Sequence, residues 1–191
     1  MYDLLIKGGM IVDGSGMPAY YGDVGIKDGK IAEVGRLHGP AERVINAEGR
    51  VVAPGFIDNH CHFDAQVTWD PLCTYSPNHG VTTVIFGNCS LGLAPVRPDD
   101  HESLAMMLSR VEAIPMESLS AGVEWDWETF PEYLDKIDRQ LGVNVGVMMG
   151  HSAIRQYIMG DDAREREQAT DEEIEAMKAI VRDGIRSGAV G

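Results

Sequence analysis

The stretch GFIDNHCHFD, residues 55–64, places two histidines one residue apart, directly after an apolar run. In an extended strand, residues two positions apart point to the same side, so Asp58, His60 and His62 line one face and Cys61 points to the other. Two imidazoles on one face can bind a single metal ion. An unliganded, hydrogen-bonded pair is the alternative, but a pair at the end of a buried strand, where α/β sites form, favours the metal.

Zinc is the metal that this pattern favours. Zinc binds imidazole and thiolate groups, and a catalytic zinc usually takes three protein ligands and leaves one position for water. Cys89 lies in IFGNCS, just past a second apolar run. Because the carboxyl ends of neighbouring parallel strands lie side by side, Cys89 is the third candidate ligand. Spacing alone does not exclude the alternative, a buried thiol that acts only as a small apolar residue.

Three apolar runs predict the strands that carry these residues. Residues 51–60 are rich in strand formers, and residues 80–88 and 142–150 resemble strands that are covered on both faces. Strands that alternate with helices predict a parallel sheet, either open and doubly wound or closed into an eight-stranded barrel. A barrel usually takes about 250 residues, so residues 53–191 would hold only its front half.

Helices are predicted between the later strands. Asp99 or Asp100 can cap a helix whose apolar positions keep helical spacing. These positions are Leu104, Met107, Val111 and Ile114. Capping-box patterns predict two further helix starts, at Thr129 with Glu132 and at Thr170 with Glu173. The last helix should end at Gly188, where GAVG would open a fourth strand, and its apolar stripe should face the core. The stripe consists of Ile174, Met177, Val181 and Ile185.

Residues 1–52 form a different kind of segment, with short apolar strands broken by glycine. Asp28-Gly29 between two alternating strands predicts a tight hairpin. We therefore expect a small antiparallel β domain in residues 1–52 and an α/β domain in residues 53–191. About 50 residues of short strands bury little surface alone, so the first domain should pack against something else.

Charge and composition limit the partners and the location. The net charge of −14 disfavours nucleic acid and anionic membranes as partners. No apolar run reaches the roughly 18 residues of a membrane span, and MYDLLIKGG lacks the features of a signal peptide, so we expect a cytoplasmic protein. Three cysteines at irregular spacing (Cys61, Cys73 and Cys89) argue against a disulfide framework.

Two stretches carry a resemblance to a known family. APGFIDNHCHFD (53–64) resembles the first barrel strand of the amidohydrolase superfamily, whose motif Pro-Gly-Phe-x-Asp-x-His-x-His supplies two metal ligands. HGVTTVIFGNCSLGLAP (79–95) and the chain from Val143 onward resemble the N-acyl-D-amino-acid deacylase (D-aminoacylase) family. The resemblance implies an α/β fold, the front part of a (β/α)8 TIM-like barrel. Residues 1–52 would then be the N-terminal half of a small β-sandwich.

The resemblance also implies the chemistry. His60, His62 and Cys89 would bind zinc, and metal-activated water would remove the acyl group from an N-acyl-D-amino acid, a small-molecule substrate. Asp58 would orient an imidazole by a hydrogen bond, unless nearby backbone satisfies it. The family's other metal ligands and its catalytic aspartate are expected beyond Gly191.

GHSAIR (150–155) supplies weaker candidates, because it follows the third predicted strand and would lie at the same rim. His151, Ser152 and Arg155 are candidate substrate-binding residues, and the planar guanidinium of Arg155 suits a carboxylate. A capped loop with a structural arginine is the alternative. For the whole protein, two other functions remain open: a cyclic amidohydrolase of the hydantoinase or dihydroorotase kind, and an inactive fragment that needs the rest of the chain. A homo-oligomer is compatible with each of these functions.

Overall fold

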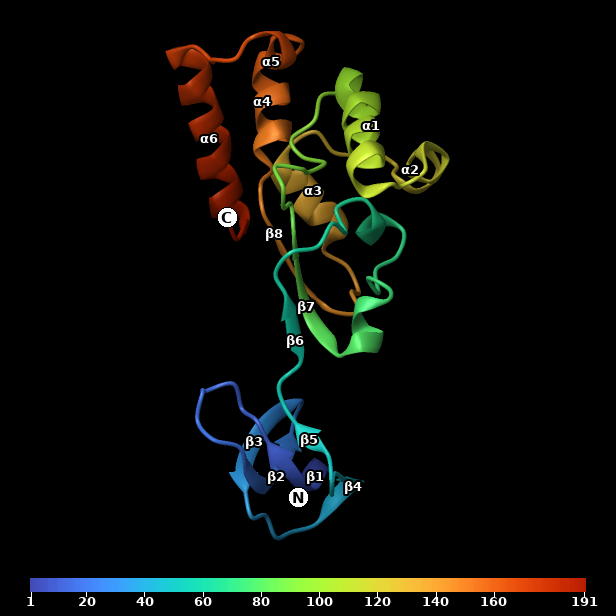
Figure 1. Cartoon of the computed structure of the whole chain (residues 1–191), viewed down its shortest axis with the longest axis vertical. Coiled ribbons are helices and arrows are strands. Elements are labelled where there is room, and N and C mark those ends of the chain that lie inside the picture. Colours follow the sequence, from blue (N-terminus) through green and yellow to red (C-terminus); the bar gives the residue numbers. More distant parts are fainter. The chain divides into compact units, whose positions relative to one another are not determined.

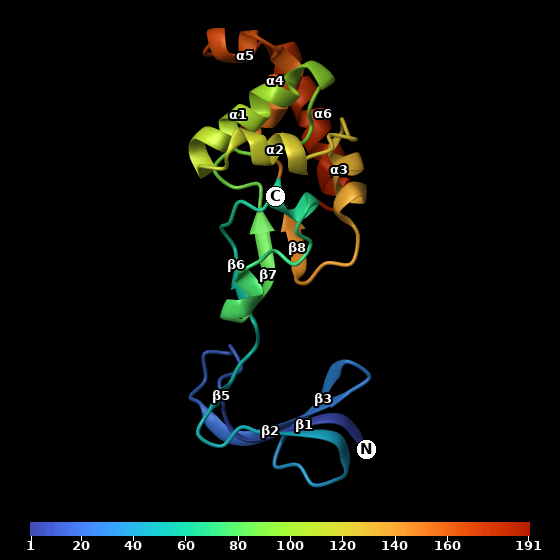
Figure 2. The same cartoon turned by 90° about the vertical axis from the view of Figure 1, so that its right-hand side faces the viewer.

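The computed structural model describes all residues from Met1 to Gly191 and contains two compact units, Met1–Gly55 and Phe56–Gly191. The smaller unit is a five-stranded sheet in the order β3-β2-β1-β4, with β5 also paired to β1 (Figures 1 and 2). Its strands are β1 Tyr2–Ile11, β2 Tyr20–Lys27, β3 Lys30–Gly35, β4 Ala41–Asn46 and β5 Val51–Val52.

The predicted hairpin of the smaller unit is confirmed. Strands β2 and β3 pair antiparallel, and the turn between them places Asp28 at φ 51° and Gly29 at φ 70°. Two positive φ values in a two-residue turn match the twist of the flanking strands. The prediction of a purely antiparallel sheet was wrong, because β4 and β5 both run parallel to β1. The chain crosses from β3 at one edge of the sheet to β4 at the other, and this crossover sets the parallel direction.

The larger unit contains the predicted parallel sheet, in the order β6-β7-β8. Its strands are β6 Phe56–Asp58, β7 Val81–Phe86 and β8 Asn144–Val147. The central strand β7 is the core of this unit, since Val84 and Phe86 are fully buried. Strand β6 ends earlier than predicted, so His60 and His62 lie in the loop after the strand and not within it.

Helices follow the strands of the larger unit. They are α1 His101–Glu112, α2 Met116–Gly122, α3 Phe130–Ile137, α4 His151–Met159, α5 Asp162–Glu165 and α6 Asp171–Ser187. Short 3-10 turns lie at Gln66–Thr68, Ser76–His79 and Pro98–Asp100. In both views α1 and α4 lie beyond the tips of the strand arrows, so helices gather at the carboxyl end of the sheet (Figures 1 and 2). None of the helices is both long and apolar enough to cross a membrane.

All three predicted helix starts are confirmed, but only two of them have the predicted side-chain cap. Thr129 with Glu132 and Thr170 with Glu173 both form complete capping boxes, and α6 ends at Gly188 in a left-handed conformation. Asp100 precedes α1, but its side chain makes no capping bond. Its carboxylate instead accepts a hydrogen bond of 2.9 Å from the Gln156 side chain on α4.

The apolar stripes of α1 and α6 are buried less than their spacing predicts. In α1 the buried residues are Leu104, Ala105 and Leu108, whereas Val111 is 57% exposed. In α6, Ile185 is 46% exposed, and the only buried residue of the helix is Gly184. Helix α6 contacts α3 and α4, and Met149 packs where a side chain on Gly184 would stand. The face of α6 that carries Gly184 therefore packs closely against Met149.

The predicted fourth strand is present only as two hydrogen bonds. The Val190 N–H donates to the Val147 carbonyl at 2.9 Å, and the Met149 N–H donates to the Gly191 carbonyl at 3.0 Å. Residues 188–191 are not assigned as a strand. The segment nevertheless lies along the end of β8, on the side away from β7.

Candidate metal centre

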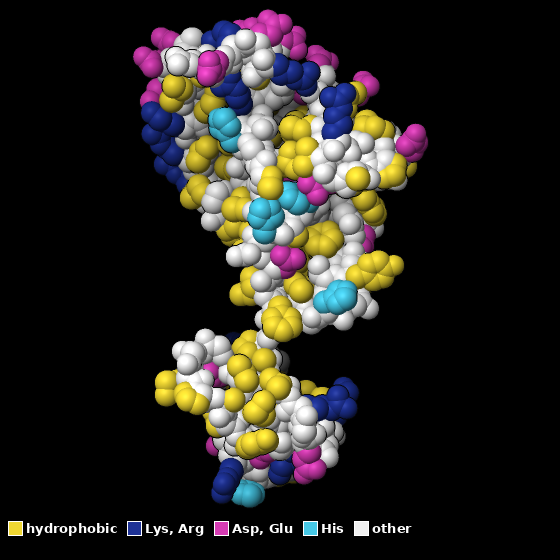
Figure 3. Space-filling model, viewed as in Figure 1, with side chains coloured by type: hydrophobic (Ala, Val, Ile, Leu, Met, Phe, Trp, Pro, Cys, Tyr) yellow, Lys and Arg dark blue, Asp and Glu magenta, His cyan; other side chains and the backbone are white.

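Three side chains converge at the carboxyl end of the parallel sheet. The donor atoms of His60, His62 and Cys89 all lie within 4.8 Å of one another. The His60 Nε2 atom is 3.1 Å from the Cys89 Sγ atom, and the two imidazole rings are 5.5 Å apart at an angle of 68°. In the space-filling view, histidine side chains lie side by side on the surface of the larger unit (Figure 3). The structure thus brings all three predicted ligands together.

The loops that carry these residues are bonded to each other. The backbone N–H and the thiol of Cys61 both donate to the Ile85 carbonyl, each at 3.3 Å. From the second loop, the buried Asn88 side chain donates to the same carbonyl at 2.9 Å and to the Cys61 carbonyl at 3.4 Å. Burial raises the pKa of the Cys61 thiol to about 12. Cys61 therefore joins the two loops and faces away from the three donors.

His62 has the surroundings of a metal-binding imidazole. Its Nε2 atom lies 3.7 Å from the Glu112 carboxylate at the end of α1, while its Nδ1 atom is buried without a hydrogen-bond partner. Imidazoles that bind a metal through one nitrogen usually present the other to a carboxylate or carbonyl. Sequence reasoning missed Glu112, because no local pattern links a residue in a helix to a loop fifty positions earlier.

The donor set fits zinc. Two imidazoles and one thiolate are ligands that zinc accepts, and donors around one tetrahedral zinc lie roughly 3–4 Å apart. The buried Nδ1 atom of half-buried His62 is a second sign, since buried polar atoms are rarely left without a partner. These residues can therefore hold a zinc ion with little rearrangement.

For Asp58 the structure supports the second of the two predicted alternatives, an acid that is satisfied by nearby backbone. Its Oδ1 atom accepts a hydrogen bond of 3.2 Å from the backbone N–H of His60. This bond shapes the turn after β6 but does not reach an imidazole ring. The carboxylate that faces an imidazole is that of Glu112, which approaches from α1.

Asp64 anchors the other end of the histidine loop. Burial raises the pKa of its carboxyl group to about 7, and its Oδ2 atom has no hydrogen-bond partner. Its backbone carbonyl accepts a hydrogen bond of 2.7 Å from the hydroxyl of Tyr133 on α3. Helix α3 therefore fixes the position of the loop just after His62.

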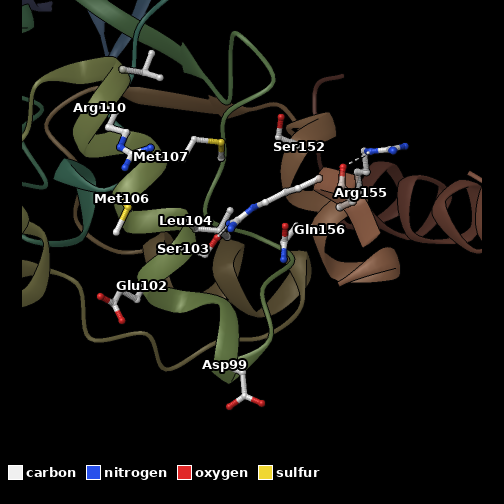
Figure 4. A pocket seen from close by; sticks show the side chains of 13 residues that line it. Asp99, Glu102, Ser103, Leu104, Met106, Met107, Arg110, Ser152, Arg155 and Gln156 are labelled. Carbon is white, nitrogen blue, oxygen red and sulfur yellow. Dashed lines mark hydrogen bonds between the residues drawn. The ribbon is translucent and has the colours of Figure 1, made fainter. Parts of the chain in front are cut away.

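The substrate-binding candidates of GHSAIR have other partners. His151 is exposed, and Ser152 bonds to Ser90, next to Cys89. Arg155 donates to three backbone carbonyls, those of Ala163, Arg166 and Glu167. Arg155 lies beside a cavity of about 700 Å³ between α1 and α4. Figure 4 draws its hydrogen bond to the Ala163 carbonyl as a dashed line. The fork of Arg155 is thus occupied by the segment around α5, which supports the structural alternative.

Arg155→Ala should therefore lower stability and leave substrate binding unchanged. Hydrogen bonds to a charged group contribute about 1.5–3 kcal/mol each, so the loss of three should lower the free energy of unfolding by at least about 3 kcal/mol. KM should stay within about twofold. Urea unfolding and steady-state kinetics check both. Arg110→Ala is the matched control, since Arg110 is exposed beside the same cavity and should change stability by less than about 0.5 kcal/mol. A large rise in KM with unchanged unfolding would restore the substrate-binding role.

Comparison with known proteins places the chain in a family. Residues 43–191 match the amidohydrolase family model. The chain is 36% identical over its whole length to a D-aminoacylase from Alcaligenes xylosoxydans xylosoxydans, of which it spans 37%. It is 34% identical to an N-acyl-D-aspartate deacylase of that organism, with 99% of this chain and 36% of the relative covered. The N-acyl-D-glutamate deacylase of Bordetella bronchiseptica, solved with zinc and a phosphonate inhibitor, matches at TM-score 0.81 and 32% identity, over 100% of this chain and 37% of its own. The chain belongs to the amidohydrolase family.

Proposed function

We propose that the protein is a zinc-dependent amide hydrolase that removes the acyl group from N-acyl-D-amino acids. The convergence of His60, His62 and Cys89 on one point carries this proposal. Two relatives that match 99% of the chain are, by name, deacylases of N-acyl-D-aspartate and N-acyl-D-glutamate, and an N-acyl-D-glutamate deacylase that matches the whole chain was solved with zinc. The chain spans little more than a third of their length, so the activity is proposed for the full-length protein.

The residues of this chain would provide the metal-binding side of the reaction. Zinc, when bound, supplies Lewis-acid chemistry, since it lowers the pKa of water and polarises an amide carbonyl. His60, His62 and Cys89 would hold it, and Glu112 would keep the His62 ring in place. Asp58 would act on the backbone of His60, not on the substrate. None of these side chains is assigned the proton transfer to the leaving amine.

The finer architecture belongs to the same proposal. Parallel strands β6, β7 and β8, with donors at their carboxyl ends, support the front part of a (β/α)8 barrel in residues 53–191. Residues 1–52 would be the N-terminal half of a β-sandwich. The cytoplasmic location and the homo-oligomer stay predictions.

A substrate panel with defined metal content tests the function. The full-length protein should hydrolyse N-acetyl-D-amino acids, including those of aspartate, glutamate and leucine, and should release the free amine. The N-acetyl-L forms should react at least about a hundredfold more slowly. Activity should disappear after chelation and return on addition of zinc.

Two outcomes would contradict the proposal. A zinc-loaded protein that opens hydantoin or dihydroorotate rings but leaves every N-acetyl-D-amino acid intact would be a cyclic amidohydrolase. Full activity in a protein that retains no metal after exhaustive chelation would remove the role of the three donors.

A further inference from the structure

We propose that Ser90 and Ser152 form a clamp that fixes Cys89 at the metal centre, so that the start of α4 sets the position of the thiolate ligand. This inference rests on the proposed function, because it assigns positioning residues to a ligand of that site. It gives GHSAIR a role that differs from substrate binding. Ser152 would act through Cys89 and would be a positioning residue.

The backbone at Cys89 needs external support. Cys89 and Ser90 have φ values of 55° and 66°, so two consecutive residues with side chains adopt the left-handed conformation. Non-glycine residues rarely adopt this conformation, and they keep it only where surrounding contacts enforce it. The direction of the Cys89 side chain depends on this turn. Whatever holds the turn therefore also sets the position of the Sγ atom.

A local hydrogen bond of 2.9 Å from the Leu91 N–H to the Asn88 carbonyl closes the turn, and the contacts to Ser90 from outside it come from α4, 62 positions along the chain. The Ser152 N–H donates to the Ser90 Oγ atom at 2.9 Å and to the Ser90 carbonyl at 3.1 Å. The two hydroxyl oxygens are 3.0 Å apart, which is a further hydrogen bond. Both residues are half-buried, and Figure 4 shows Ser152 near the start of α4. One residue of α4 thus contacts both the side chain and the backbone of Ser90.

The metal centre is sensitive to small displacements of this turn. The Cys89 Sγ atom lies 3.1 Å from His60 Nε2, so the thiolate and the imidazole are already at the spacing of shared ligands. Zinc–sulfur and zinc–nitrogen bonds are about 2.3 and 2.0–2.1 Å long, and they tolerate only small errors in donor position. Loss of the clamp would leave all three donors present but let the thiolate move. Metal affinity, more than folding, should then change.

Cobalt binding to the full-length protein tests the clamp. Cobalt replaces zinc in such sites, and a thiolate ligand gives a charge-transfer absorption band. Ser90→Ala removes both hydroxyl contacts and should weaken cobalt binding about 10–100-fold and reduce the band. Ser152→Ala keeps the N–H bonds and should weaken it about tenfold. Ser152→Thr, which retains a hydroxyl, should restore binding. Ser187→Ala is the control, since it removes one hydroxyl bond within α6 and should change nothing at the metal.

Each result decides a separate point. Unchanged cobalt affinity and unchanged band intensity in both alanine variants, beside a wild type that binds cobalt and hydrolyses its substrate, would overturn the clamp alone. A wild type that binds no cobalt would overturn the proposed function together with the clamp. If Ser90→Ala lowers the melting temperature of the metal-free protein, the cobalt affinities of Ser152→Ala and Ser152→Thr still test the clamp. Equal affinities in these two variants would overturn it.

Discussion

Replacing Cys89 by alanine in the full-length protein is expected to weaken zinc binding by about 10²–10³-fold. Zinc sites bind with about 10–16 kcal/mol in total, so one ligand of about four contributes roughly 3–4 kcal/mol, which is that factor in affinity. Cys89 is exposed, so the change removes a donor without opening a cavity in the core. Competition with a chelating dye measures the affinity, and amine release from an N-acetyl-D-amino acid should fall at least as far when zinc is limiting.

Cys61→Ser is the matched control for this change. Cys61 lies between the two histidines, but its side chain bonds to the Ile85 carbonyl, a bond that serine can keep. Zinc affinity should therefore stay within about threefold of the wild type. A Cys89→Ala variant with full zinc content and full activity would contradict our assignment of Cys89 as a zinc ligand.

The sequence predicts the ligands because their signals are local. His60 and His62 stand one residue apart after an apolar run, and Cys89 follows the next run directly. Buried parallel strands are short and apolar, so β7 and β8 are visible from composition alone. Parallel order then places the residues after β6 and β7 at one end of the sheet, where the structure has them.

The contacts that support the ligands could not be predicted, because they join residues far apart in the chain. Glu112 faces His62 across fifty positions, and Ser152 contacts Ser90 across 62. A serine or glutamate on a helix has the same local pattern whether it faces solvent or a metal centre. For Asp100 the local pattern predicts a capping bond, but its side chain accepts a hydrogen bond from Gln156 on another helix instead. Tertiary packing decides such partners.

Gly150→Ala is expected to destabilise the protein and to weaken zinc binding, although Gly150 touches no donor atom. Gly150 has φ −69°, a value that alanine adopts readily, so the backbone conformation is no obstacle. An added Cβ atom would overlap the Leu91 carbonyl and lie 2.7 Å from the Ser90 carbonyl. Both are backbone atoms, so the loop of Cys89 or the start of α4 has to move. Overpacking should lower the free energy of unfolding by about 2–4 kcal/mol, and zinc affinity should fall at least about tenfold. Urea unfolding of the metal-free protein and zinc titration measure the two effects.

Gly92→Ala is the matched control, because it adds the same methyl group to the loop on the other side of the contact. The nearest atom to its Cβ would be the Gly150 nitrogen at 3.4 Å, an ordinary van der Waals distance. Stability should change by less than about 1 kcal/mol, and zinc affinity should not change measurably. If Gly150→Ala and Gly92→Ala behaved alike, the Cys89 loop could not be packed against the start of α4 as described. The position of the thiolate would then have to be set by the histidine loop alone.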